Sequence, residues 1–195
     1  LVTKENHEPY RMMTSRAEYR LLLRQDNADL RLGKIGYEIG LVSQDEYEKI
    51  LDKERAIKEE VERLNHTSIG ASPNVQEFLS SHGSTPLKTG ATLAELVRRP
   101  ELDYFMLTEI DKKRPILAED VQEQVNINLK YEGYIHRQMQ QVVQFKKMEG
   151  KRLPENFDYS VVKSLRKEAI QKLNQFQPTS VGQASRISGV SPADI

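Results

Sequence analysis

The chain has 195 residues, of which 29 are Lys or Arg and 29 are Asp or Glu, so its formal net charge is zero. Because it contains no Cys, it cannot form a disulfide framework, a thiolate metal site or a cysteine nucleophile. The longest apolar run, Tyr104 to Leu107, is far shorter than the roughly 20 residues that a membrane-spanning helix requires.

Helix start signals recur along the chain and predict an all-α fold. Three pairs have the spacing of a capping box, in which a hydroxyl and a carboxylate each accept a hydrogen bond from a backbone N–H at the helix start. These pairs are Ser15 with Glu18, Ser43 with Glu46, and Thr92 with Glu95. Sustained alternation of apolar and polar residues, which is typical of strands, is absent from the sequence.

A long helix is predicted from about Leu117 to Met148, with two apolar stripes that indicate packing on two sides. Gly133 lies inside this helix, where glycine costs about 1 kcal/mol relative to Ala, so close helix packing or a nearby ligand is expected there. Residues 66–90 are rich in Ser, Thr, Gly and Pro and predict a loop-rich joint. We therefore expect an irregular helical array over residues 1–116 and a small bundle around the long helix over residues 117–195.

Sequence motifs for catalysis, cofactors and metals are missing. The four His residues are far apart and have no partners at a metal-ligand spacing. Neither a nucleophile elbow nor a glycine-rich phosphate loop is present. We therefore assign no catalytic, cofactor-binding or metal-binding residue in this chain.

Two basic features are candidates for binding a polyanion. A helix capped by Ser15 would place Arg16, Arg20 and Arg24 within an arc of about 80°, where they need carboxylates or phosphates opposite them. Internal ion pairing and anion recognition both remain open for this stripe. Residues 129–172 hold ten Lys and Arg against five Asp and Glu, which indicates either an anion-binding face or an ordinary solvated one.

The last residues predict a tight corner between two helices. A helix is expected to stop at Gly189, and Ser191 followed by Pro192 is expected to cap the next one. Such corners occur in nucleic-acid-binding hairpins, but most of them only turn the chain.

Three spaced motifs resemble one family. The string E-P-Y-R-x-x-T-S-R-A-E-Y-R-L-L-L-R-x-D-N-A-D-L-R-L at residues 8–32 is similar to the segment that follows the flavin-binding portion of the MnmG family, also called GidA. The stretch K-Y-E-G-Y-I-x-R-Q at residues 130–138 and the stretch G-Q-A-S-R-I-S-G-V-S-P-A-D-I at residues 182–195 agree with the same family.

The resemblance implies the C-terminal part of an enzyme that modifies carbon 5 of the wobble uridine of tRNA. Members of the family bind FAD, use NADH, act with the GTPase MnmE, form homodimers and work in the cytoplasm, and their chemistry lies outside the segment that this chain resembles. The chain begins at Leu1 without Met, and we expect it to be a fragment that lacks its last helix and is inactive alone.

The resemblance and the charge pattern together give two sets of candidate residues. We expect tRNA contacts from Arg11, Arg16, Arg20, Arg24, Arg31, Lys146, Lys147, Lys151 and Arg152, and contacts with the MnmE partner from Tyr131, Tyr134, Arg137, Arg186 and Gly189. A rival interpretation is a purely structural scaffold for dimerisation or for docking MnmE, without tRNA contact. An independent hydrolase is a third class, which only an unrecognised site would support.

Overall fold

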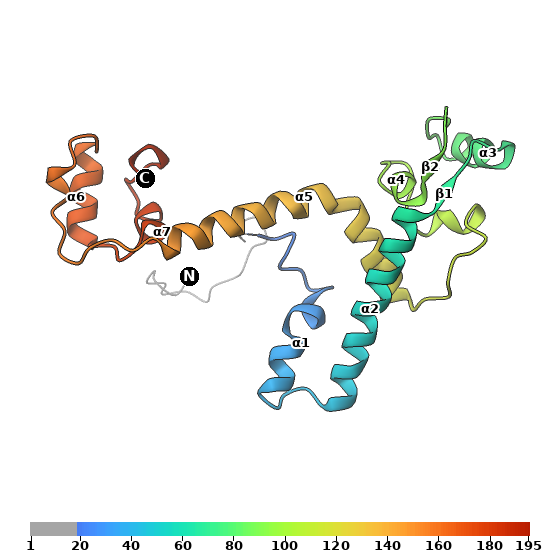
Figure 1. Ribbon diagram of the computed structural model, residues 1–195, viewed down its shortest axis with the longest axis horizontal. Helices are drawn as coiled ribbons and strands as arrows, with labels where there is room; N and C mark the ends of the chain where they lie inside the picture. Colours follow the sequence, from blue (N-terminus) through green and yellow to red (C-terminus); the bar gives the residue numbers. More distant parts are fainter. Residues whose placement is uncertain (1–18) are drawn as a thin grey trace, which may run out of the picture. The chain divides into compact units, whose positions relative to one another are not determined.

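The computed structural model describes residues 19–195, and this part of the chain folds as helices with one small antiparallel sheet (Figure 1). The elements in order are α1 (Ala28–Glu38), α2 (Gln44–His66), β1 (Ser68–Ile69), α3 (Pro73–Ser81), β2 (Ala91–Thr92), α4 (Leu93–Val97), the 3-10 helix η2 (Met106–Glu109), α5 (Glu119–Gly150), η3 (Tyr159–Val161), α6 (Lys167–Phe176), α7 (Val181–Ser185) and η4 (Pro192–Asp194). The predicted all-α class is confirmed.

Contacts divide the chain into two compact units, unit 1 up to Ile135 and unit 2 from His136 onward. The division falls within α5, because its first half packs into the core of unit 1 through Val121, Val125 and Leu129. The domain boundary predicted after Ile116 stays a prediction. Charge is also divided: unit 1 has 19 basic and 24 acidic residues, whereas unit 2 has 10 basic and 5 acidic residues.

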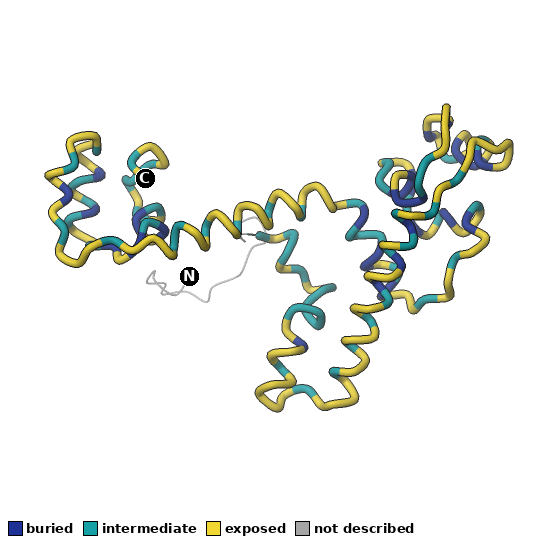
Figure 2. The backbone as a smooth tube through the Cα atoms, viewed as in Figure 1, coloured by how far each residue is buried: buried dark blue, intermediate teal, exposed yellow. Residues whose placement is uncertain are grey.

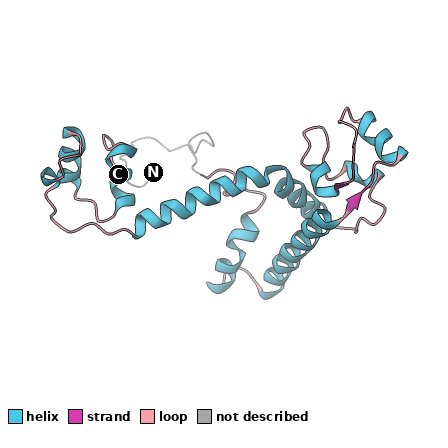
Figure 3. Cartoon of the chain, turned by 45° about the horizontal axis from the view of Figure 1, so that its top comes forward, coloured by secondary structure: helices cyan, strands magenta, loops and turns pink. Residues whose placement is uncertain are grey.

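Local capping signals place the helices of unit 1. Ser43 caps α2 and Thr92 caps α4, each in a complete capping box, which confirms two of the predicted starts. The predicted joint at 66–90 contains β1 and α3, and β1 pairs with β2 in the register Ser68 with Thr92 and Ile69 with Ala91 (Figure 3). The sheet thereby brings the end of α2 next to α4, over a core that includes Leu64, Leu79, Leu93, Leu96, Leu102, Tyr104 and Leu107.

A charged network is buried beside this core. Arg63 of α2 donates from Nε and Nη2 to the Glu60 carboxylate at 2.7 and 2.8 Å, and from Nη2 to Asp111 at 2.5 Å. The Tyr104 hydroxyl donates to the same Glu60 carboxylate at 2.8 Å. Both carboxylate side chains are almost fully buried, at 2% and 3% exposed. One guanidinium therefore pairs with two buried carboxylates and ties α2 to the segment before α5.

Unit 2 has a separate small core. Tyr159, Leu173 and Ala184 form its buried centre, with six further apolar side chains packed around them. Residues 151–153 lie alongside residues 179–181, because the Val181 N–H donates to the Lys151 carbonyl at 2.9 Å and the Leu153 N–H donates to the Thr179 carbonyl at 3.0 Å. This pairing fixes the chain that leaves α5 against the start of α7.

The corner near the C-terminus has the predicted turn chemistry. Gly189 has a φ of +96°, and Ser191 with Asp194 forms a capping box at the start of η4. The preceding helix, α7, already ends at Ser185 rather than at Gly189. The Asp194 carboxylate accepts from Ser191 and from Arg166, so the corner is held to the start of α6.

Three local predictions were wrong for the described residues. Residues 19–23 form turns, so the helix expected to carry Arg20 and Arg24 is absent there, and α1 begins only at Ala28. A Cβ added at Gly133 would have no described atom within 4 Å, so close packing does not explain this glycine, and the alternative of a nearby ligand stays a prediction. Packing on two sides is also absent from the middle of α5, where the exposed residues include Tyr131, Tyr134, Met139 and Val143. Figure 2 shows this stretch of the helix mostly in the yellow of exposed residues.

Candidate functional site

Four basic side chains of unit 2 form the strongest candidate for anion binding. We name Lys146, Lys147, Lys151 and Arg152 the basic quartet. The first two lie in the last turns of α5 and the other two follow directly, on the segment that pairs with residues 179–181. All four are exposed, and none forms an ion pair with another described residue. Among residues 19–195, no carboxylate therefore lies within ion-pair distance of these four charges, although Arg152 is close enough to Glu149 to contribute to the lowered pKa of that carboxyl.

Glu149 lies in the last turn of α5, between Lys147 and Lys151 in the sequence. Its carboxylate accepts from the Ser180 hydroxyl at 3.0 Å and from Nη1 of Arg186. The Arg186 guanidinium holds the pKa of Glu149 below its usual value, so this side chain is negative at neutral pH. Sequence reasoning missed Glu149, because Arg186 is 37 residues further along the chain and no local pattern connects them.

Two candidates for partner contacts instead help to hold unit 2 together. Arg186 binds Glu149 and lies over the Phe145 ring, with Cζ 5.1 Å from the ring centroid. The Gly189 carbonyl accepts from Nη2 of Arg166 at 3.2 Å. These contacts give both residues a structural role, and a role in binding a partner stays a prediction.

The N-terminal arginines are placed differently from one another. Arg24 donates to Asp26 from Nε at 3.0 Å, to the Leu21 carbonyl at 2.6 Å and to the buried Gln124 of α5 at 3.2 Å. Burial alone would raise the pKa of Asp26, but hydrogen bonds from Gln124 and Arg24 outweigh it and lower the pKa. Arg24 is thus committed to an internal carboxylate, as one of the two open interpretations expected.

The other members of that set have different surroundings. Arg31 donates to Asn27 at 2.9 Å and to the Arg24 carbonyl at 3.0 Å, so it also holds the chain ahead of α1. Arg20 is exposed. Arg11 and Arg16 lie outside the described residues. The predicted three-arginine stripe therefore has no helix to carry it over the residues that the structure describes.

The candidates on the middle of α5 are exposed. Tyr131 is 46% exposed and Tyr134 is 60% exposed, one helical turn apart, and Arg137 is exposed one turn further on. An exposed pair of aromatic rings on a helix is a typical feature of protein interfaces, where Tyr is enriched.

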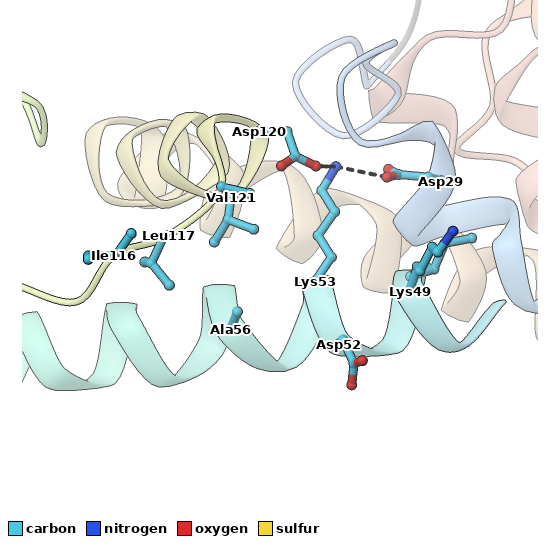
Figure 4. Close-up of a pocket in the computed structure, with 11 residues that line it drawn as sticks. Asp29, Lys49, Asp52, Lys53, Ala56, Ile116, Leu117, Asp120 and Val121 are labelled. Carbon is cyan, nitrogen blue, oxygen red and sulfur yellow. Dashed lines mark hydrogen bonds and ion pairs between the residues drawn. The ribbon is translucent and has the colours of Figure 1, made fainter. Parts of the chain in front are cut away.

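A cavity of about 450 Å³ lies in unit 1 where α1, α2 and the start of α5 meet (Figure 4). Its centre is Lys53, whose Nζ lies 2.8 Å from Asp29 and 2.9 Å from Asp120. The two carboxylates outnumber the single ammonium, and Lys49 and Asp52 add one charge of each sign at the rim. The cavity therefore offers no excess positive charge to a phosphate, and the ion cluster joins three helices.

Clusters of three or more side chains that could hold a metal ion are not found among residues 19–195. In the same part of the chain, no helix combines the length and the hydropathy needed to cross a membrane.

Comparison with known proteins connects both units to one family. Residues 44–139 match the model of the tRNA modifying enzyme MnmG/GidA C-terminal helical domain, and residues 141–195 match the model of the MnmG/GidA C-terminal helical bundle. Among named relatives, the tRNA uridine 5-carboxymethylaminomethyl modification enzyme MnmG of Lachnoclostridium phytofermentans is 69% identical and that of Caldicellulosiruptor saccharolyticus is 60% identical. Both alignments cover the whole chain, but only 31% of either relative.

Solved structures give the same result. The structure of Aquifex aeolicus GidA in its form II crystal superposes with a TM-score of 0.68 and 36% sequence identity, over 97% of this chain and 29% of that one. The form I crystal gives a TM-score of 0.65 at the same identity. The chain thus spans less than a third of the proteins that it matches.

Proposed function

The chain belongs to the MnmG/GidA family of tRNA-modifying enzymes, as part of its C-terminal helical region, and we propose that it serves such an enzyme by binding tRNA through unit 2. The observation that carries the proposal is the basic quartet. The quartet places four exposed cations within seven residues, in a unit with twice as many basic as acidic side chains. This concentration of positive charge favours the binding of a polyanion. Phosphate contacts by Lys and Arg supply most of the affinity of such a surface without reading the sequence.

The chemistry belongs, in this proposal, to the part of the enzyme that this chain does not contain. The relatives are about three times as long as the chain, and FAD and NADH are the cofactors that we assign to that remainder. The chain would position tRNA for a reaction that modifies the wobble uridine, and would carry out no step itself.

MnmE docking is the second element of the proposal. The exposed Tyr131 and Tyr134 support it, because two large aromatic side chains on a solvated helix bury apolar area on binding a protein partner. The rival scaffold role is favoured by Arg24, whose charge is used internally. The tRNA role is favoured by the quartet, whose charges have no carboxylate partner among the described residues.

Titration of the purified chain with tRNA over a range of salt concentrations tests the proposal. Replacing the basic quartet with Ala should reduce the slope of log affinity against log salt by roughly two to four units, since each lost phosphate contact removes somewhat less than one unit. The matched control replaces Lys58, Lys88, Lys112 and Lys113 of unit 1, which are equally exposed and change the net charge by the same amount. Equal effects of the two sets, or no binding at low salt, would replace the tRNA role with the scaffold role.

A parallel titration with MnmE separates the two partners. Changing Tyr131 and Tyr134 to Ala should weaken association with MnmE and leave the salt slope for tRNA unchanged. If the basic quartet, and not the tyrosine pair, controls MnmE association, the assignment of the two surfaces is wrong.

A further inference from the structure

Glu149 is an acidic side chain in the middle of the basic surface of unit 2. Lys146 precedes it by one helical turn and Arg152 follows it by three residues. Its carboxylate lies against the start of α7, where a Cβ added to Gly182 would be 2.6 Å from the carboxylate carbon. Glycine at position 182 therefore leaves the space in which Glu149 contacts Ser180 and Arg186.

Arg186 is held from two sides and remains accessible. Its guanidinium binds Glu149 and lies over the Phe145 ring, yet half of the side chain is exposed to solvent. A guanidinium binds carboxylate and phosphate with the same planar set of donors. Arg186 thus donates to Glu149 from a guanidinium group that could otherwise donate to a phosphate oxygen.

We propose that Arg186 is a further phosphate-contact residue of unit 2, and that Glu149 lowers the affinity of this unit for RNA by neutralising it. The inference rests on the proposed tRNA function and adds one residue to the basic quartet. A carboxylate beside a phosphate chain also repels it, because like charges in contact weaken association. Glu149 thereby limits the strength of RNA binding, and Arg186 becomes a full contact only when Glu149 releases it.

Glu149→Gln tests the proposal with little change in shape. The amide oxygen of Gln can still accept from Arg186 and Ser180, but the negative charge is gone. We expect binding to a transcribed tRNA at low salt to tighten about three- to tenfold, and the log–log salt slope to become steeper by about one unit, as for one additional phosphate contact. The matched control is Glu155→Gln, since Glu155 is an exposed acid of the same unit without an ion pair among the described residues. It should tighten binding about twofold at most and leave the slope unchanged.

The double variant Glu149→Gln with Arg186→Gln identifies the responsible contact. If Arg186 is the additional phosphate ligand, this double variant should return the slope to that of the unmodified chain. Retention of the steeper slope in the double variant would overturn the proposal, and so would equal behaviour of Glu149→Gln and Glu155→Gln.

Folding is checked by circular dichroism, with Glu149→Ala as a second variant that removes the carboxylate without supplying an amide. Both Glu149 variants should change the slope in the same direction, and opposite directions would contradict the proposal. If the unmodified chain and all variants fail to bind tRNA, the proposed function fails together with this inference. Only this inference fails if the unmodified chain binds tRNA and replacement of the basic quartet with Ala reduces the salt slope, while Glu149→Gln behaves like its control Glu155→Gln.

Discussion

Arg63→Met should destabilise unit 1 far more than the loss of an ordinary surface ion pair. Arg63 is the guanidinium that pairs with both Glu60 and Asp111, and their carboxylate side chains are only 2% and 3% exposed. Removing one partner of a buried ion pair typically costs about 3–5 kcal/mol, because the remaining charge is left without compensation. Arg63 itself is a quarter exposed, and water can reach part of the vacated space, so we expect a value near the lower end, about 3 kcal/mol.

Urea unfolding followed by far-ultraviolet circular dichroism measures this free energy. Arg55→Met is the matched control, since Arg55 lies on the same helix and pairs with Asp52 at 3.0 Å, with both side chains mostly exposed. Such surface pairs contribute about 0–1 kcal/mol. Adding Glu60→Gln to Arg63→Met should restore about 1 kcal/mol or more, because it removes a buried charge while Tyr104 can still donate to the amide oxygen. Equal costs for Arg63→Met and Arg55→Met, or no restoration by Glu60→Gln, would show that the buried network is not held by charge compensation.

Four further results are expected. Gly189→Val should cost more than about 1 kcal/mol in unfolding experiments, because a β-branched residue is strained at the φ of +96°. Gly133→Ala should instead stabilise by about 0.5–1 kcal/mol, because an added Cβ in the middle of α5 meets no described atom. A neutral effect of Gly189→Val would contradict the turn geometry. Arg166 holds the pKa of Asp194 well below its usual range. The ionised Asp194 should therefore contribute its full stabilisation above about pH 4, and this stabilisation should be lost as the pH falls further. Thermal unfolding at several pH values should show that Asp194→Asn lacks this acid dependence. The purified chain should be colourless, and a stoichiometric flavin absorbance would refute the assignment of FAD to the rest of the enzyme.

Local patterns predicted the helices well where the signal lies within one turn. The capping boxes at Ser43 and Thr92 depend on a side chain three residues away, so the sequence shows both partners together. The helix expected before Arg24 failed because Arg24 and Asp26 bind Gln124, about 100 residues further along the chain. Such long-range hydrogen bonds outweigh local propensity and leave no periodic signal.

The candidate site shows the same limit. The concentration of Lys and Arg around the end of α5 is visible in the sequence, and the structure finds these side chains exposed. Whether a basic residue is neutralised depends on contacts between distant segments. Arg186 looks like a free cation in the sequence, but it is paired with Glu149, whereas Lys147 has no such partner among the described residues.

The isoelectric point of 7.1 hides the unequal division of charge between unit 1 and unit 2. An average over the chain describes neither unit, because unit 2 keeps an excess of positive charge at the pH where the molecule as a whole has none. A protein adsorbs to an ion exchanger through a local region of its surface, so the charge of that region decides retention. A cation exchanger at neutral pH and low salt should therefore retain this chain despite its zero net charge. Its elution position will then report the basic surface of unit 2 rather than the total composition.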